Sequence, residues 1–306
     1  MIGVVTGFSI IGIVIAVGFF TGKYGVLGEN AKQVLSRTAF FVTNPALLFV
    51  VLSRADIHQI FSSFVLIALL SAVAVAALYL AASRLFFRRP AAETALGAMA
   101  AFFVNANNIG IPVAIYVLGD AAFVAPVILL QMVILTPVCL SILDLTAGNK
   151  VSVRRILTQP LRNPVILAAL AGAAVSATGF VLPAPVLAPL ELLGGAAVPL
   201  VLMAFGMSLV GMRPLRAGTG RAEIIVGTAL KSVVMPVAAY LIARFGFGAS
   251  GHDLFGAVVM AALPTAQNVF LFASRYDRGV VVTRDIVLLS SIGAVPVLLV
   301  VTAFLG

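Results

Sequence analysis

Ten long apolar runs divide this 306-residue chain, and short segments rich in Lys and Arg separate them. A helix needs about 20 residues to cross the hydrocarbon core of a bilayer. The runs predict ten spans, at about 3–22, 31–52, 61–87, 94–118, 121–146, 161–181, 186–210, 223–245, 253–275 and 281–305. Hydrophobic residues make up 62% of the chain and charged residues 9%, too apolar for a water-soluble surface. We therefore expect an all-α integral membrane protein.

The basic residues are distributed unevenly between the two sides that this pattern defines. Loops after even-numbered spans hold Arg54 and Arg244, and Lys231 lies inside span 8. The other 16 of the 19 basic residues are Lys23, Lys32, Arg37, Arg84, Arg88, Arg89, Lys150, Arg154, Arg155, Arg162, Arg213, Arg216, Arg221, Arg275, Arg278 and Arg284, in or beside loops after odd-numbered spans. Because cytoplasmic loops carry the excess of Lys and Arg, we expect a multi-pass plasma-membrane protein with both termini outside the cytoplasm. This pattern is typical of membrane loops and gives no indication of nucleic-acid binding.

A weak internal repeat relates the two halves of the chain. Three pairs of positions carry it: Pro137 and Pro296, 159 residues apart; Asn107-Asn108 and Gln267-Asn268, 160 apart; Pro45 and Pro199, 154 apart. Five spans per half would place the halves upside down relative to each other, so we predict inverted five-helix repeats at 1–150 and 151–306 within one membrane domain. Inverted repeats with interrupted helices are typical of secondary transporters. The alternative is a chance likeness between apolar helices.

Spans 4 and 9 contain residues that interrupt a helix near mid-membrane. Span 4 carries Asn105, Asn107 and Asn108 before Gly110 and Pro112, and span 9 carries Pro264, Thr265, Gln267 and Asn268. An unwound segment exposes a half-helix N-terminus, whose N–H groups favour an anion, and frees carbonyls that favour a cation or a donor. We expect the two segments to meet and form a substrate site that includes these amides and Thr265. The alternative is that the amides only join helices.

Two further polar residues lie inside predicted spans. Asn44 precedes Pro45 in span 2, where it could contribute to the site or cap a kink. Lys231 lies about eight residues, or roughly 12 Å, from the inner end of span 8. A charge at this depth is costly and is usually functional. Lys231 could attract an anionic substrate, stand where another transporter holds sodium, or bond structurally to helix carbonyls.

The sequence contains no combination of residues typical of catalysis. We find no serine–histidine–carboxylate set, metal-ligand cluster or phosphate-binding glycine loop, so we expect no enzyme activity, no cofactor and no ATP-driven step. A channel and an intramembrane enzyme are the other classes. The inverted repeat and the interrupted helices disfavour the channel, and the lack of a nucleophile–base pair disfavours the enzyme.

The stretches Asn44–Phe49 and Asn105–Pro112 resemble the auxin efflux carrier family, and the likeness covers the whole chain. The compact prokaryotic branch is the most similar, because the long central loop of many plant members is missing. The resemblance implies two inverted five-helix repeats, an elevator-type movement, crossing helices 4 and 9, a possible homodimer, and transport of anions such as auxin-like acids, malate or malonate.

The family resemblance also implies ligands at the crossing, where plant members use a proline and asparagines for the carboxylate. Asn107, Asn108 and Pro112 occupy one break, and Pro264, Gln267 and Asn268 occupy the other. A sodium-coupled symporter of the related bile-acid type is the alternative. No acidic residue is central in any predicted span, which disfavours sodium coupling.

Overall fold

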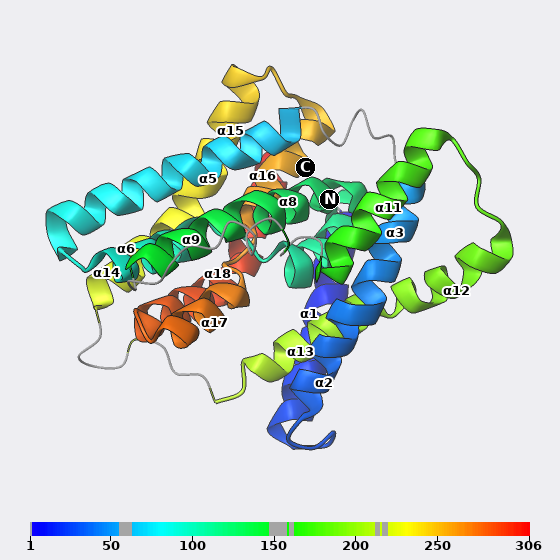
Figure 1. Cartoon of the computed structure of the whole chain (residues 1–306), viewed down its shortest axis with the longest axis horizontal. Coiled ribbons are helices and arrows are strands. Elements are labelled where there is room, and N and C mark those ends of the chain that lie inside the picture. Colours follow the sequence, from blue (N-terminus) through cyan, green and yellow to red (C-terminus); the bar gives the residue numbers. More distant parts are fainter. Residues whose placement is uncertain (1, 55–62, 147–157, 159–161, 212–214, 216–219) are drawn as a thin grey trace.

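The chain is built from helices (Figure 1), and its computed structural model describes residues 2–54, 63–146, 158, 162–211, 215 and 220–306. Within these ranges the extended pairing is limited to one isolated bridge, which confirms the all-helical prediction. The α-helices are α1 (Ile2–Lys23), α2 (Ala31–Thr38), α3 (Asn44–Arg54), α5 (Ser63–Ala82), α6 (Ala91–Phe102), α7 (Ile111–Val113), α8 (Val124–Leu129), α9 (Thr136–Thr146), α11 (Pro164–Thr178), α12 (Ala184–Gly195), α13 (Ala197–Ser208), α14 (Arg221–Ala229), α15 (Met235–Leu241), α16 (Gly251–Ala262), α17 (Gln267–Tyr276) and α18 (Val280–Leu305). Wider π-helical turns join several of them: η1 (Ala39–Thr43), η2 (Ser83–Phe87), η3 (Ala106–Gly110), η4 (Ala114–Leu118), η6 (Leu130–Leu135), η8 (Leu230–Val234) and η9 (Ile242–Gly246), with a 3₁₀ turn at η5 (Ala121–Phe123).

Six helical stretches of the described chain are long and apolar enough to cross a membrane: Ala31–Arg54, Ser63–Phe87, Ala121–Thr146, Ala184–Ser208, Arg221–Gly246 and Val280–Leu305. Five shorter apolar helices are Ser9–Lys23, Ala91–Phe102, Ala106–Leu118, Pro164–Thr178 and Gly251–Ala262. These stretches fall within or overlap the ten predicted spans. The count of ten and the inverted repeat stay predictions. The repeat boundary at 150/151 and the basic residues Lys150, Arg154, Arg155, Arg213 and Arg216 lie outside the described residues.

Helix α5 has apolar side chains on both its buried face and its exposed face. Leu66, Leu70 and Val73 recur at helical spacing and are 45–54% exposed, whereas Ile67 and Val75 are buried against neighbouring helices. Both faces are apolar, which is the pattern of a helix that packs on protein with one side and on lipid with the other. Exposing the outer apolar face to water would cost about 25 cal/mol of free energy for each Å² of apolar surface.

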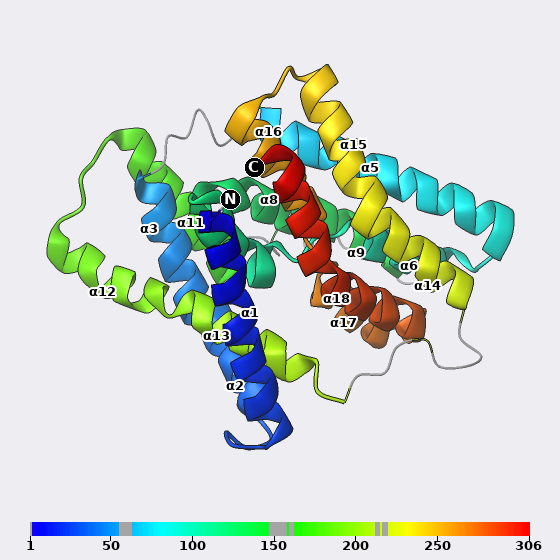
Figure 2. The same ribbon diagram turned by 180° about the vertical axis from the view of Figure 1, so that it is seen from behind.

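The helices form two groups that lie on opposite sides in both overall views (Figures 1 and 2). The support group consists of α1–α3 and α11–α13, and the crossing group consists of α5–α9 and α14–α18. Within the support group α1 packs closely on α13. A Cβ on Gly18 would lie 2.6 Å from Met203 Cα, and one on Gly206 would lie 2.7 Å from Phe19 N, so these two glycines permit the approach.

The predicted kink at Pro45 is a widened turn in a continuous helical stretch. Asn44 N donates to Ala39 O, five residues back, at the end of η1, and α3 then carries Pro45 in its first turn. Proline has no N–H to donate to the carbonyl four residues back, and the wider π turn before Pro45 accommodates the proline ring and this missing hydrogen bond. The expected interruption is therefore confined to a change of helical pitch.

Candidate functional site

The first interruption separates α6 from η3. Helix α6 ends at Phe102, and Phe103 is extended, with φ −78° and ψ 110°. Asn105 begins the next half-helix, because its Oδ1 accepts a hydrogen bond from Asn108 N at 3.2 Å. This is the helix-capping chemistry that asparagine favours. Pro112 lies buried in the short helix α7 beyond it.

The second interruption separates α16 from α17. Helix α16 ends at Ala262, and Leu263 has the extended angles φ −56° and ψ 147°. Pro264 follows, and Gln267 starts α17 after Ala266 in a β conformation. The residue before a proline is driven out of the helical region, which explains why the helix stops here.

The two interruptions meet and satisfy each other's backbone groups. Asn105 N donates to Pro264 O at 2.7 Å, and Ala266 N donates to Phe103 O at 3.0 Å. Val104 and Thr265 lie opposite each other as an isolated antiparallel bridge. Unwound backbone inside a membrane is stable only when such partners exist. The crossing expected from the sequence is therefore present in the structure.

Thr265 contributes its side chain to closing the breaks. It is fully buried, its Oγ1 donates to Ala100 O at 2.6 Å, and its N donates to Ser290 Oγ at 3.1 Å. In a continuous α-helix Ala100 O would accept from Val104 N, which the extended segment prevents. The hydroxyl of Thr265 thus replaces a lost helical donor.

Lys231 faces the protein interior, as its depth predicts, and is fully buried in η8. Its Nζ donates to Ala261 O at 2.8 Å and to Met235 Sδ at 3.2 Å. The ion pairs among the described residues do not include it. Of the partners foreseen from the sequence, the structure shows the helix carbonyl.

A cavity of about 680 Å³ lies against the crossing. Its lining includes five of the ten residues predicted for the site, namely Asn105, Asn107, Asn108, Gln267 and Asn268. The other five, Asn44, Pro112, Lys231, Pro264 and Thr265, are not part of the lining. The structure thus gathers the amides of both breaks around one space and leaves Asn44, the two prolines, Thr265 and Lys231 out of its lining.

Three basic residues also line this cavity, and sequence reasoning did not assign them to the site. Lys32 and Arg37 lie on α2, and Arg284 lies on α18, where it pairs with Asp285 at 2.7 Å. The described lining contains no carboxylate. A signal was available in the sequence, since Lys32, Gln33, Ser36 and Arg37 form a polar stripe on one side of α2, and a stripe of this kind beside apolar spans indicates a wet surface.

Two side-chain hydrogen bonds among the described residues join the two helix groups beside the cavity. Asn163 Nδ2, at the start of α11, donates to Met132 Sδ in η6 at 3.1 Å. Gln267 Nε2 in the crossing group donates to Ser208 Oγ in the support group at 3.1 Å. Ser208 Oγ itself donates to Phe205 O, at 2.6 Å. A predicted site amide is therefore held by the support group in this form of the protein.

The chain matches the family described as membrane transport protein over residues 4–302. It belongs to this family. A Rhizobium meliloti protein named "Putative malonate transporter" is 28% identical over 270 residues, covering 86% of this chain and 83% of that protein. The transporter YfdV of Escherichia coli K12, named as uncharacterized, is 25% identical over 274 residues, covering 87% and 86%. An uncharacterized transporter of Methanothermobacter thermautotrophicus is 27% identical over 285 residues, covering 92% and 91%.

Membership confirms the resemblance to the auxin efflux carriers. The protein is a multi-pass membrane transporter with a small-molecule substrate, and it is not an enzyme.

Several amides of this transporter have unused hydrogen-bonding capacity near the cavity. Asn105 Nδ2, Asn107 Oδ1 and Gln131 Oε1 are buried and have no hydrogen-bond partner within the described chain. Buried polar atoms are nearly always satisfied by protein or water. Groups at a transport site have to exchange partners when substrate arrives, so a donor and acceptor set that the protein itself leaves unsatisfied suits such a site.

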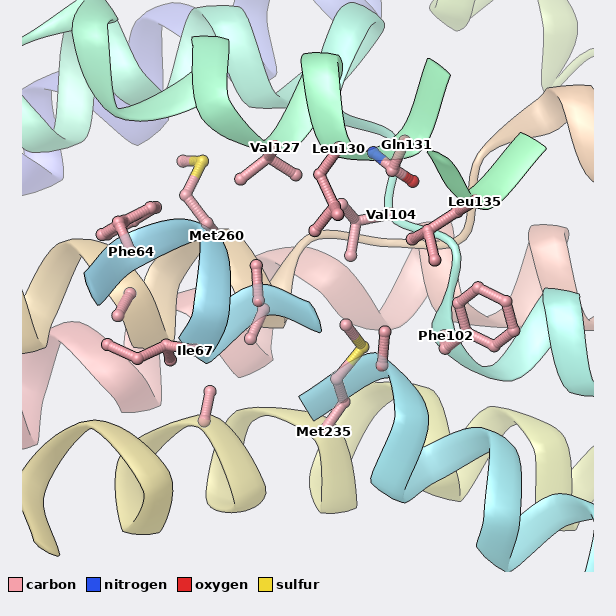
Figure 3. Close-up of a pocket in the computed structure, with 15 residues that line it drawn as sticks. Phe64, Ile67, Phe102, Val104, Val127, Leu130, Gln131, Leu135, Met235 and Met260 are labelled. Atoms are coloured by element: carbon pink, nitrogen blue, oxygen red, sulfur yellow. The ribbon is translucent and has the colours of Figure 1, made fainter. Parts of the chain in front are cut away.

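A second, much smaller cavity also lies against the crossing, beside Phe102 and Val104 (Figure 3). Its volume is about 20 Å³, room for about one water molecule, and its walls are almost entirely apolar. Val104 and Gln131 line both cavities, so they separate the large space from the small one. The crossing therefore has a large polar space on one side of Val104 and Gln131 and a small apolar space on the other.

Proposed function

We propose that this transporter carries small organic anions, dicarboxylates such as malonate among them, across the plasma membrane. The observation that carries the proposal is the composition of the large cavity. Amides from both breaks line it together with Lys32, Arg37 and Arg284, and its described lining has no carboxylate. Because Asp285 partly neutralises Arg284, Lys32 and Arg37 give this space most of its positive potential, which attracts anions and repels cations. The name of the Rhizobium meliloti relative supports malonate as the first substrate to test.

Two kinds of group in the cavity suit the two ends of a dicarboxylate. The half-helices that begin after Asn105 and at Gln267 start at the cavity lining with the positive ends of their dipoles, and no side chain caps the second one. We assign one carboxylate to these N-termini and the amides of Asn107 and Asn268. We assign the second carboxylate to the basic lining. Pro264 acts indirectly in this proposal, because it ends α16 at the second break, and we assign no ligand role to Pro112, which lies in α7 beyond the first break.

The same proposal includes an elevator-type movement of the crossing group against the support group. The large cavity reaches Lys32 and Arg37, which the charge pattern places at the cytoplasmic side. The structure would then be the inward-open form, with both termini outside and with inverted repeats at 1–150 and 151–306. From the family resemblance we also propose a homodimer. We place the dimer interface on the support group, because that group would not move during transport.

Uptake of labelled malonate into proteoliposomes tests the function. We expect saturable uptake that other small dicarboxylates inhibit and that the uncharged diamide malonamide does not. Asn107→Ala should abolish uptake, whereas Asn44→Ala removes a buried amide that lies outside the cavity and should leave it measurable. No uptake of any mono- or dicarboxylate by well-folded protein would refute the proposed substrate class.

Sodium coupling of the bile-acid-transporter type is the alternative mechanism. Replacing sodium by choline at constant ionic strength in the same assay separates the two. We expect equal uptake in both, since the freed carbonyl at the end of α16 already holds an ammonium group.

A further inference from the structure

The end of α16 has a carbonyl that the interruption deprives of its helical donor. In a continuous helix Ala261 O would accept from Thr265 N, but Thr265 N donates to Ser290 Oγ instead, at 3.1 Å. Lys231 Nζ takes the vacant place on Ala261 O at 2.8 Å. The lysine thus completes the broken end of this half-helix.

The matching position at the first break is completed without a charge. Ala100 O, near the end of α6, accepts a hydrogen bond from the hydroxyl of Thr265 at 2.6 Å. A neutral donor is therefore sufficient to satisfy a freed carbonyl in this fold. The hydrogen bond alone does not explain a fully buried ammonium at the second break, because burying a charge in a membrane protein is expensive.

The chemistry of a broken helix end suits a cation. Aligned peptide dipoles give the C-terminal end of a half-helix a partial negative charge. In transporters with discontinuous helices, freed carbonyls and half-helix C-terminal ends coordinate the coupling ion. Lys231 Nζ lies at such an end, with Met235 Sδ as its second partner at 3.2 Å and with no carboxylate partner among the described residues.

We propose that Lys231 is a tethered cation, which permanently fills the position where a free monovalent cation would bind at the end of α16. Because this positive charge is covalently attached to the chain, the protein does not need to bind a sodium ion at that position. Shortening the side chain empties the position and creates a site for a small free cation. The consequence for coupling rests on the proposed transport function, but the cation site itself can be tested without any substrate.

Thermal unfolding of purified protein in matched chloride salts is the test. The variants are Lys231→Ala, which removes the ammonium and opens space, and Lys231→Met, which removes the charge but keeps most of the chain length. Ser71→Ala is the matched control. Ser71 is fully buried and lies 160 residues before Lys231, but among the described residues its Oγ bonds only to Ile67 O of its own helix, at 2.6 Å.

We expect the wild type to unfold at the same temperature in sodium, methylammonium and choline. Lys231→Ala should unfold at a lower temperature in choline, and sodium or methylammonium should raise its midpoint by about 3 °C or more. Lys231→Met and Ser71→Ala should respond to none of the salts. A lysine that only holds the helices together would lower the midpoint of Lys231→Ala equally in every salt.

Two results would overturn the proposal: a Lys231→Ala midpoint that is the same in all three salts, or a sodium response in the wild type as large as in the variant. If Lys231→Ala does not fold in choline, the yield of monodisperse protein in methylammonium and in choline replaces the midpoint. A higher yield in methylammonium supports the tethered cation, and equal losses refute it. Failure to transport malonate would leave these measurements unchanged, so the two proposals fail separately.

Discussion

Replacing Ser208 by alanine should shift the transporter away from the form in which the large cavity is open. Ser208 Oγ accepts the hydrogen bond from Gln267 Nε2 that connects the support group to the crossing group at 3.1 Å. If the crossing group moves past the support group, this bond has to break. It therefore stabilises the open-cavity form relative to the form on the other side of the membrane.

The size of the shift follows from the surroundings of the bond. A neutral hydrogen bond contributes about 0.5–1.5 kcal/mol net. Gln267 lines the cavity, so its released amide can bond to water and adds no large penalty. Because 1.4 kcal/mol corresponds to about a factor of 10, the ratio of the two forms should change about 2- to 12-fold.

Labelling of a cavity cysteine from outside measures this ratio. The background is Cys139→Ala, which removes the single native cysteine, and the reporter is Thr136→Cys in the cavity lining. In alternating access, an outside reagent reaches the reporter only in the rare outward form. With Ser208→Ala added, we expect an impermeant maleimide to label it from outside about 2 to 12 times faster.

The control for this experiment is Ser141→Ala. Ser141 Oγ donates to Pro137 O within its own helix at 2.7 Å, just as Ser208 Oγ donates to Phe205 O at 2.6 Å. Both substitutions lose one bond of this kind, and only Ser208→Ala also loses the Gln267 hydrogen bond between the groups. Equal labelling rates for the two variants would show that the Gln267–Ser208 bond does not favour either form.

Three further predictions follow from the crossing and the charge pattern. Asn107→Ala or Asn268→Ala should abolish uptake while the unfolding midpoint stays within a few degrees, and normal uptake by both would mean that these amides only join helices. Thr265→Val should lower the free energy of unfolding by about 1–3 kcal/mol, because it leaves the buried Ala100 O without its donor. Thermal unfolding measures this loss, and Thr302→Val is the control, because its buried hydroxyl bonds within its own helix. A loss of stability no larger than that of Thr302→Val would contradict the prediction. A cysteine at position 150 should react with an impermeant reagent only from the cytoplasmic side, and labelling from outside intact cells would reverse the predicted topology.

The helix interruptions could be predicted from sequence because their causes are local. Proline removes a donor, and asparagine caps a helix start, whatever surrounds them. The breaks after Phe102 and Ala262 accordingly lie beside Asn105 and Pro264. The sequence overestimates the disruption at Pro45, because a widened turn before α3 accommodates that proline within a continuous helical stretch.

The partners of buried polar groups could not be predicted, because they depend on how distant segments pack. The depth of Lys231 indicated a buried charge but left its partner open, and only the fold brings Ala261 O to it. Lys32 and Arg37 entered the sequence argument as topology signals, and their place in the cavity follows from the packing of α2. Asp285, fully buried beside Arg284, lies near the end of its span and gave no such signal.

The pairing of the two breaks limits how this transporter can change access. Separating them would break both backbone hydrogen bonds of Phe103, Asn105, Pro264 and Ala266, four residues that are buried even where they line the cavity. Each lost partner costs several kcal/mol in such a buried place, so we expect the two breaks to move as one body. The groups, in contrast, meet through apolar helix faces and neutral bonds such as Gln267–Ser208, which water can replace in the cavity. Moving the crossing group as a unit past the support group is therefore less costly than opening the crossing itself, and this difference favours an elevator over a gate formed by the broken helices.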